Sequence, residues 1–151
     1  MQPQSTPTPG RRTGYVFAII FLMVFMVFIN NLLQWDLPFI RNYVTPAFNG
    51  WLWAGNLSLA VAIFCNVLFL AYDPRWFRHL MQVIQNGFSL LSTYMFFSIF
   101  PLKLPSPMIE QIVHWGLLIA MVLTVIGILV EAIQAVTTYY RDNLRGRSAS
   151  N

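Results

Sequence analysis

Side chains that could carry chemistry are few in this sequence and widely spaced. The candidates are two histidines, His79 and His114, the single cysteine, Cys65, and one acid inside an apolar run, Glu131. Ionising an acid inside a membrane helix is costly, which makes Glu131 a candidate proton or cation carrier if that run crosses a membrane. If Glu131 instead lies near the membrane surface, it is a structural acid that pairs with Arg78.

The remaining candidates predict no catalytic or cofactor site. Imidazole is a common haem ligand, but the predicted topology places His79 near the inner membrane surface and His114 near the outer one, so one haem cannot bind both. Neither Ser89 nor Ser92 has a histidine on the same side of the membrane to activate it. Cys65 has no second cysteine for a disulfide or a metal pair. We therefore expect no enzyme, no cofactor and no bound metal.

The composition indicates a protein that lies in lipid. Of the 151 residues, 57% are hydrophobic and only 9% are charged, whereas about a quarter of the residues of a soluble domain are charged. The net charge of +4 could indicate a nucleic-acid partner, but the nine basic residues stand at the ends of apolar runs instead of gathering on one polar face. We expect the lipid bilayer as a partner and no nucleic acid.

Four apolar runs are long enough to cross a bilayer, which takes about 20 residues. They predict membrane spans over about residues 14–35, 46–72, 78–100 and 111–137. Residues 1–13, rich in Pro, Ser, Thr and Gln, predict a disordered tail, and residues 141–151 predict a basic tail. The whole of residues 14–140 is then one transmembrane domain.

The turn between the second and third runs, AYDPRWFRHLMQ, determines the topology. Asp73 is a suitable helix cap before Pro74, and the pairs Thr45–Pro46 and Ser106–Pro107 repeat the signal at two other helix starts. Seven of the nine basic residues flank the spans on the side of this turn and of both tails. The predicted fold is an all-α bundle of four transmembrane helices in a bacterial cytoplasmic membrane, with both termini in the cytoplasm.

Polar and small residues follow helical spacing within the spans and predict surfaces that face protein instead of lipid. The third span has an almost continuous polar row, and the fourth has small residues at three- and four-residue steps before Glu131. The seam residues are Asn56, Asn66, Gln82, Gln85, Asn86, Ser89, Gly116, Ala120, Thr124 and Gly127. They either hold the bundle together or bind another membrane protein; the alternative is that they line a polar cavity.

The stretch PAFNGWLWAGNLSLAVAIFCNVLFLAYDPRWFRHL, the later FPLKLP and a last span that contains glycine resemble small four-helix integral membrane proteins of bacteria that have no assigned activity. The resemblance covers about residues 45–134. It implies a membrane fold and no particular reaction.

Three functions fit these patterns. The first is a non-catalytic accessory or assembly subunit that binds other membrane subunits or copies of itself, because the seams exceed what a lone bundle needs. The second is a small channel or carrier that uses Glu131 and the polar row of the third span. The third is a lipid- or quinone-binding protein.

Overall fold

The computed structural model describes residues 8–35 and 38–148, and the regular structure within these ranges is helical. The helices are α1 (Pro9–Asn31), the short α2 (Pro38–Tyr43), α3 (Phe48–Ala71), α4 (Arg75–Ile99) and α5 (Pro107–Ser148). The predicted all-α class is confirmed.

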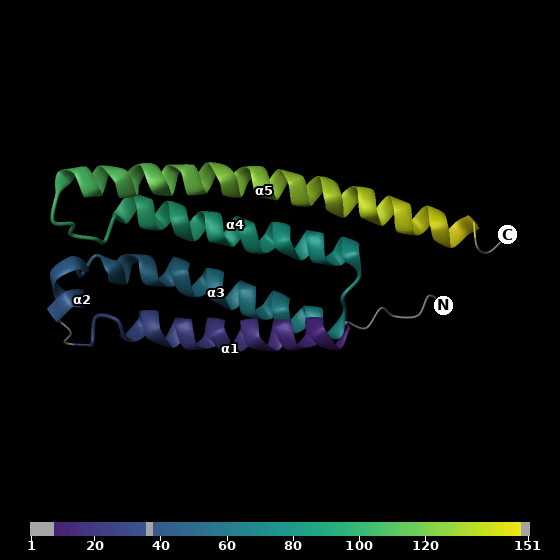
Figure 1. Ribbon diagram of the computed structural model, residues 1–151, viewed down its shortest axis with the longest axis horizontal. Helices are drawn as coiled ribbons and strands as arrows, with labels where there is room; N and C mark the ends of the chain where they lie inside the picture. The colour runs from purple at the N-terminus through teal and green to yellow at the C-terminus, as the bar shows by residue number, and fades with distance from the viewer. Residues whose placement is uncertain (1–7, 36–37, 149–151) are drawn as a thin grey trace.

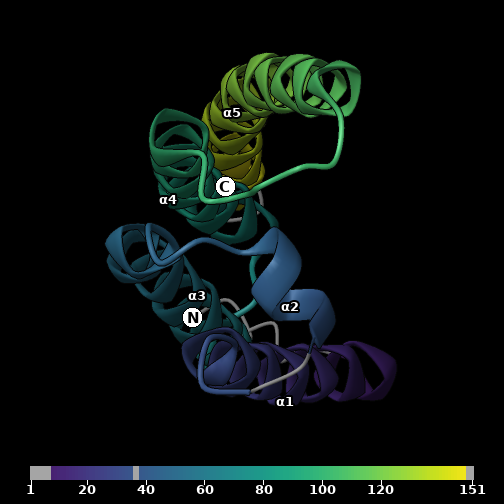
Figure 2. The same ribbon diagram turned by 90° about the vertical axis from the view of Figure 1, so that its left-hand side faces the viewer.

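The four long helices lie side by side in a curved row and run antiparallel to their neighbours (Figure 1). The backbones of α1 and α3, of α3 and α4, and of α4 and α5 lie next to each other; within the described residues, the backbone of α1 does not come close to that of α4 or α5, and the backbone of α3 does not come close to that of α5. Figure 2 shows the row end-on as an arc, with α2 on its inner side. The predicted four-helix bundle is therefore not confirmed, because the first and last helices do not meet.

Three helices, α1, α3 and α5, are long and apolar enough to cross a membrane. Their surfaces are consistent with lipid contact, since large apolar side chains such as Phe17, Phe64 and Leu123 are exposed. The third predicted span, residues 78–100, corresponds to α4, which has 25 residues but is not among these candidates in the described chain. Its polar row, from Gln82 to Thr93, lowers its overall hydropathy.

Two of the three predicted helix caps are wrong. Asp73 makes no cap hydrogen bond, and Pro74 itself occupies the N-cap position of α4. Thr45 Oγ1 donates to the Pro101 carbonyl (3.1 Å) instead of capping α3, which begins at Phe48. Ser106 does cap its helix, because its hydroxyl accepts a hydrogen bond from the Met108 N–H at 3.3 Å.

The two ends of the chain are more helical than the sequence predicts. Residues 9–13, assigned to a disordered tail, form the first turns of α1; residues 1–7 of that predicted tail lie outside the described residues. At the other end α5 continues to Ser148, so most of the predicted basic tail is helical. With 42 residues at 1.5 Å each, α5 is about 63 Å long and extends past its neighbours.

A short backbone pairing joins the two connections at the end of the row opposite the termini. The Thr45 N–H donates to Pro101 O (2.9 Å), and the Lys103 N–H donates to Tyr43 O (2.8 Å). These bonds flank a bridge between Val44 and Leu102. The link from α2 to α3 is thereby fixed against the link from α4 to α5, although these segments are far apart in the sequence.

Close packing between α3 and α4 depends on Gly55. A Cβ atom at Gly55 would lie 2.8 Å from the Trp51 ring, and that ring is held in place because its Nε1–H donates to Ser92 O of α4 (2.9 Å). We expect Gly55→Ala to lower the free energy of unfolding in detergent by about 1–3 kcal/mol. Gly87→Ala is the control, because a Cβ there meets nothing within 4 Å. Equal stabilities for the two variants would contradict this packing.

Candidate functional site

Two exposed stripes run along opposite sides of α4. Side chains at three- and four-residue steps share a side of a helix, where successive residues are about 100° apart. One stripe is mainly apolar and consists of Leu80, Ile84, Gly87, Leu91 and Tyr94. The other is polar and consists of Gln82, Asn86, Ser89 and Thr93, of which Gln82 and Ser89 are exposed and the other two are half-buried.

The polar stripe lies on the inner side of the arc. Gln85 of α4 contacts α3, since its Nε2 donates to Ala62 O at 3.2 Å, and His79 contacts α5 through Glu131. These two α4 residues are six apart, which places them about 120° from each other by the shorter way around the helix. Gln82 lies midway along that shorter way. The polar stripe therefore lies between the directions of α3 and α5, on the concave side of the arc (Figure 2).

Helix α5 adds a stripe of small and polar residues to the same side. A Cβ at Gly127 would lie 3.9 Å from Asn86 Nδ2, which places Gly127 beside the polar stripe of α4. At helical spacing from Gly127 lie Gly116, Ala120 and Gln134, all three exposed. We call the combined surface the open polar face; it consists of Gln82, Asn86, Ser89 and Thr93 of α4 with Gly116, Ala120, Gly127 and Gln134 of α5.

Several predicted seam residues lie inside the row instead of on this face. Asn56 of α3 forms a reciprocal amide pair with Asn30 of α1, with N–O distances of 2.6 and 2.9 Å. A side-chain hydrogen bond of this kind between two membrane helices contributes about 0.6 kcal/mol on average. Asn30 was not among the predicted seam residues, although a side-chain amide at the end of an otherwise apolar run was a visible signal.

Other seam residues bond to backbone carbonyls. Asn66 Nδ2 donates to Ala62 O (2.8 Å) in its own helix, and Thr124 Oγ1 donates to Ala120 O (2.8 Å). These residues thereby satisfy part of their hydrogen-bonding capacity within a single helix. Gly116 has open space beside it, since a Cβ there meets nothing within 4 Å. The predicted small-residue ladder thus approaches α4 at Gly127 but is open at Gly116.

Asp73 is the centre of a charged cluster at the end of the row where the chain begins. Its side chain is 1% exposed and lies 3.1 Å from Arg78 Nε and 3.6 Å from an Arg11 nitrogen. Tyr15 donates its hydroxyl to the same carboxylate at 3.1 Å. The Nε–H of Arg78 makes no hydrogen bond, so the attraction between Arg78 and Asp73 is mainly electrostatic.

Glu131 pairs with His79 and not with Arg78. His79 Nδ1 lies 2.5 Å from Glu131 Oε2, and both side chains are about a quarter exposed, at 24% and 23%. His114 is far from this pair, at the other end of α4, where its ring stacks on Phe100 with a centroid separation of 4.0 Å. Within the described residues, no three His, Cys, Asp or Glu side chains gather to hold a metal ion.

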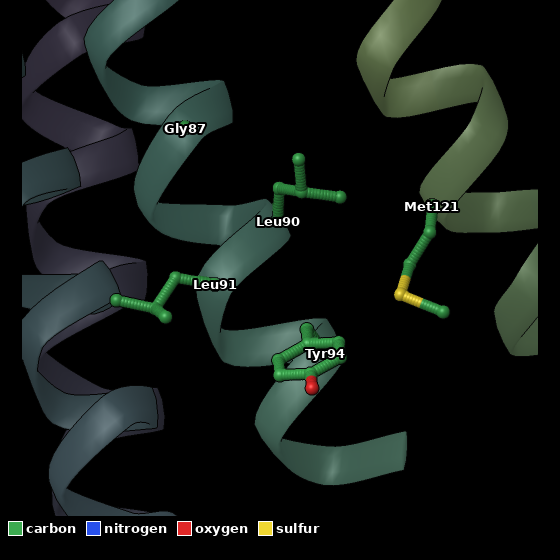
Figure 3. A pocket seen from close by; sticks show the side chains of 5 residues that line it. All are labelled: Gly87, Leu90, Leu91, Tyr94 and Met121. Carbon is green, nitrogen blue, oxygen red and sulfur yellow. The ribbon is translucent and has the colours of Figure 1, made fainter. Parts of the chain in front are cut away.

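An apolar groove lies on the side of α4 and α5 opposite the open polar face. Gly87, Leu90, Leu91, Tyr94 and Met121 line it (Figure 3), and its volume is about 400 Å³. The lining is almost entirely hydrocarbon, as expected for a surface that faces lipid chains. The two helices therefore have one apolar side and one polar side.

No protein-family model, curated protein or solved structure matches this chain. A function must therefore be inferred from the geometry of the chain's own residues.

Proposed function

We propose that the chain is a non-catalytic subunit of a membrane assembly and that the open polar face binds a helix of another membrane protein or of a second copy. In this proposal α1, α3, α4 and α5 all cross the membrane. Both termini lie in the cytoplasm, because seven of the nine basic residues flank the spans on that side.

The observation that carries the proposal is the exposure of Gln82, Ser89 and Gln134 along helices whose other exposed sides are apolar. In hydrocarbon, an amide or hydroxyl without a hydrogen-bond partner costs roughly 2–7 kcal/mol. The amides of Asn30 and Asn56 avoid that cost by pairing across α1 and α3. A helix from another chain would supply the same kind of partner on the inner side of the arc.

Small residues on the same face support close approach of such a helix. Gly116 and Ala120 are exposed, four residues apart, and small side chains at this spacing allow two membrane helices to pack backbone to backbone. Gly116 has open space around it, which is the condition for a neighbour to fit there. Hydrogen-bonding groups and small residues thus occur together on one surface.

Photo-crosslinking from two neighbouring positions tests the proposal. Ser89 and Leu91 differ in depth by only about 3 Å, yet they lie on opposite sides of α4. We expect a photoreactive amino acid at Ser89, irradiated in native membranes, to yield a discrete protein adduct, and the same group at Leu91 to yield lipid adducts only. Blue-native electrophoresis before and after crosslinking identifies the assembly.

Two outcomes would overturn the proposal. Protein adducts of equal yield from Ser89 and Leu91 would show that the two faces do not differ. No protein adduct at Ser89, together with labelling of that position by a water-soluble thiol reagent after Ser89→Cys, would indicate an aqueous path. That result would support the carrier function, in which Glu131 at the same side of α4 and α5 takes up the transported cation.

A further inference from the structure

Each stripe of the open polar face leads to an arginine. On α4, Arg75 precedes Gln82 and Ser89 at seven-residue steps, and on α5, Arg141 follows Gln134 by seven residues. Seven residues are about two helical turns, so each arginine continues its stripe on nearly the same side of the helix. Both arginines are exposed. The end of the open polar face near the chain termini is therefore cationic.

Nearby acids do not neutralise this charge. Asp73 is already surrounded by Arg11 and Arg78, and Glu131 is paired with His79. Asp142 follows Arg141 in sequence but lies about 100° around the helix, toward α4, and it is half-buried. Within the described part of the chain, neither Arg75 nor Arg141 has an ion-pair partner.

This charge disfavours a second copy as the occupant of the face. Copies of one chain insert with the same orientation, so a two-fold axis along the membrane normal brings identical ends together. Arg75 and Arg141 of one copy would then approach the same residues of the other. Like charges placed against each other at an interface select against that pairing.

We infer that the occupant is a helix of a different membrane protein, one that offers hydrogen-bonding side chains within the bilayer and carboxylates at its cytoplasmic end. This inference rests on the proposed function and specifies its partner. The open polar face supplies amides and hydroxyls at mid-helix and unpaired guanidinium groups at the end. An acidic helix end would complement the arginines at the membrane surface, while hydrogen-bonding side chains deeper in the same helix would meet the amides and hydroxyls of the face.

Reversing the charges of Arg75 and Arg141 in the protein that carries the photoreactive group tests this inference. With the photoreactive group at Ser89, we expect Arg75→Glu combined with Arg141→Glu to lower the yield of the protein adduct by at least about fivefold. The Gln double variant should lower it less, and added salt should weaken the wild-type adduct. Arg12→Glu is the matched control, because Arg12 is exposed on α1, away from the face. Monodisperse behaviour in detergent shows that each variant is folded.

The outcomes separate this inference from the proposed function. A Ser89 adduct at twice the 17.4 kDa chain mass, or a yield that rises on charge reversal, would overturn the inference and leave the proposed function standing. An adduct whose yield does not change on charge reversal would also overturn it. A lipid adduct in place of protein at Ser89, lost on charge reversal, would overturn both and identify an anionic lipid as the occupant.

Discussion

Asp73→Asn is expected to destabilise the folded protein by roughly 3 kcal/mol, at the low end of the range for breaking a buried ion pair. The substitution keeps the size of the side chain but removes its charge, and it leaves Arg78, whose side chain is only 26% exposed, without a counter-ion. It also weakens the bond from Tyr15. The measurement is the free energy of unfolding in mixed detergent, determined by steric trapping or by SDS titration.

Two comparisons separate charge pairing from other causes. Glu110→Gln changes an exposed acid in the first turn of α5, where the helix dipole contributes at most about 1 kcal/mol, so this control should be near neutral. The double variant Asp73→Asn with Arg78→Gln should recover part of the loss, because the uncompensated charge is gone. A loss below about 1 kcal/mol for Asp73→Asn alone would contradict the proposed role of the cluster.

The role of Asp73 shows where sequence reasoning stops. The turn between the second and third runs was predicted from local residues, and α4 does start there. The cap assigned to Asp73 was a local rule, whereas its actual partner Tyr15 is 58 residues away on α1. A contact at that distance depends on how helices pack, which spacing along one helix does not encode. For the same reason, spacing did not identify His79 as the side chain that lies beside Glu131, nor Asp73 as the acid that lies beside Arg78.

The polar row of α4 shows the opposite case. Gln82, Asn86 and Ser89 were predicted to share one side from their spacing alone, and they do, because helix geometry is local. Their spacing could not show that the row stays open. That depends on the directions in which α3 and α5 contact α4, about 120° apart, and on the absence of contact between α3 and α5 in the described residues. A predicted bundle assumes that the first and last helices pack against each other, and no pattern of residues along one helix determines that contact.

The small residues of the fourth predicted span lie along one side of α5, because the whole segment is helical. Gly127 and Gly116 both lie on that side, but only Gly127 lies near a side chain of α4, that of Asn86. This difference makes Gly116 a sharper probe of partner binding than Gly127, because changing Gly116 leaves the contacts within the chain intact.

Gly116→Leu is expected to lower the yield of the assembly at least about tenfold, a loss near 1.4 kcal/mol, without destabilising the isolated chain. A leucine there has room in the monomer, since nothing lies within 4 Å of the added Cβ. It would occupy the space into which a partner helix packs, and overpacking of a fitted interface typically costs about 1–3 kcal/mol. The measurement is recovery of the Ser89 adduct, together with the unfolding free energy of the purified variant.

Gly87→Leu is the matched control because it makes the same chemical change on the opposite side of the row. Gly87 is also an exposed mid-helix glycine with nothing within 4 Å of an added Cβ, so both substitutions alter helix propensity alike, by up to about 1 kcal/mol. In the proposed arrangement Gly87 faces lipid, so a leucine there would contact acyl chains and would block no protein. Equal loss of the adduct in both variants would place the effect in helix stability, whereas loss for Gly116→Leu alone would place it at the open polar face.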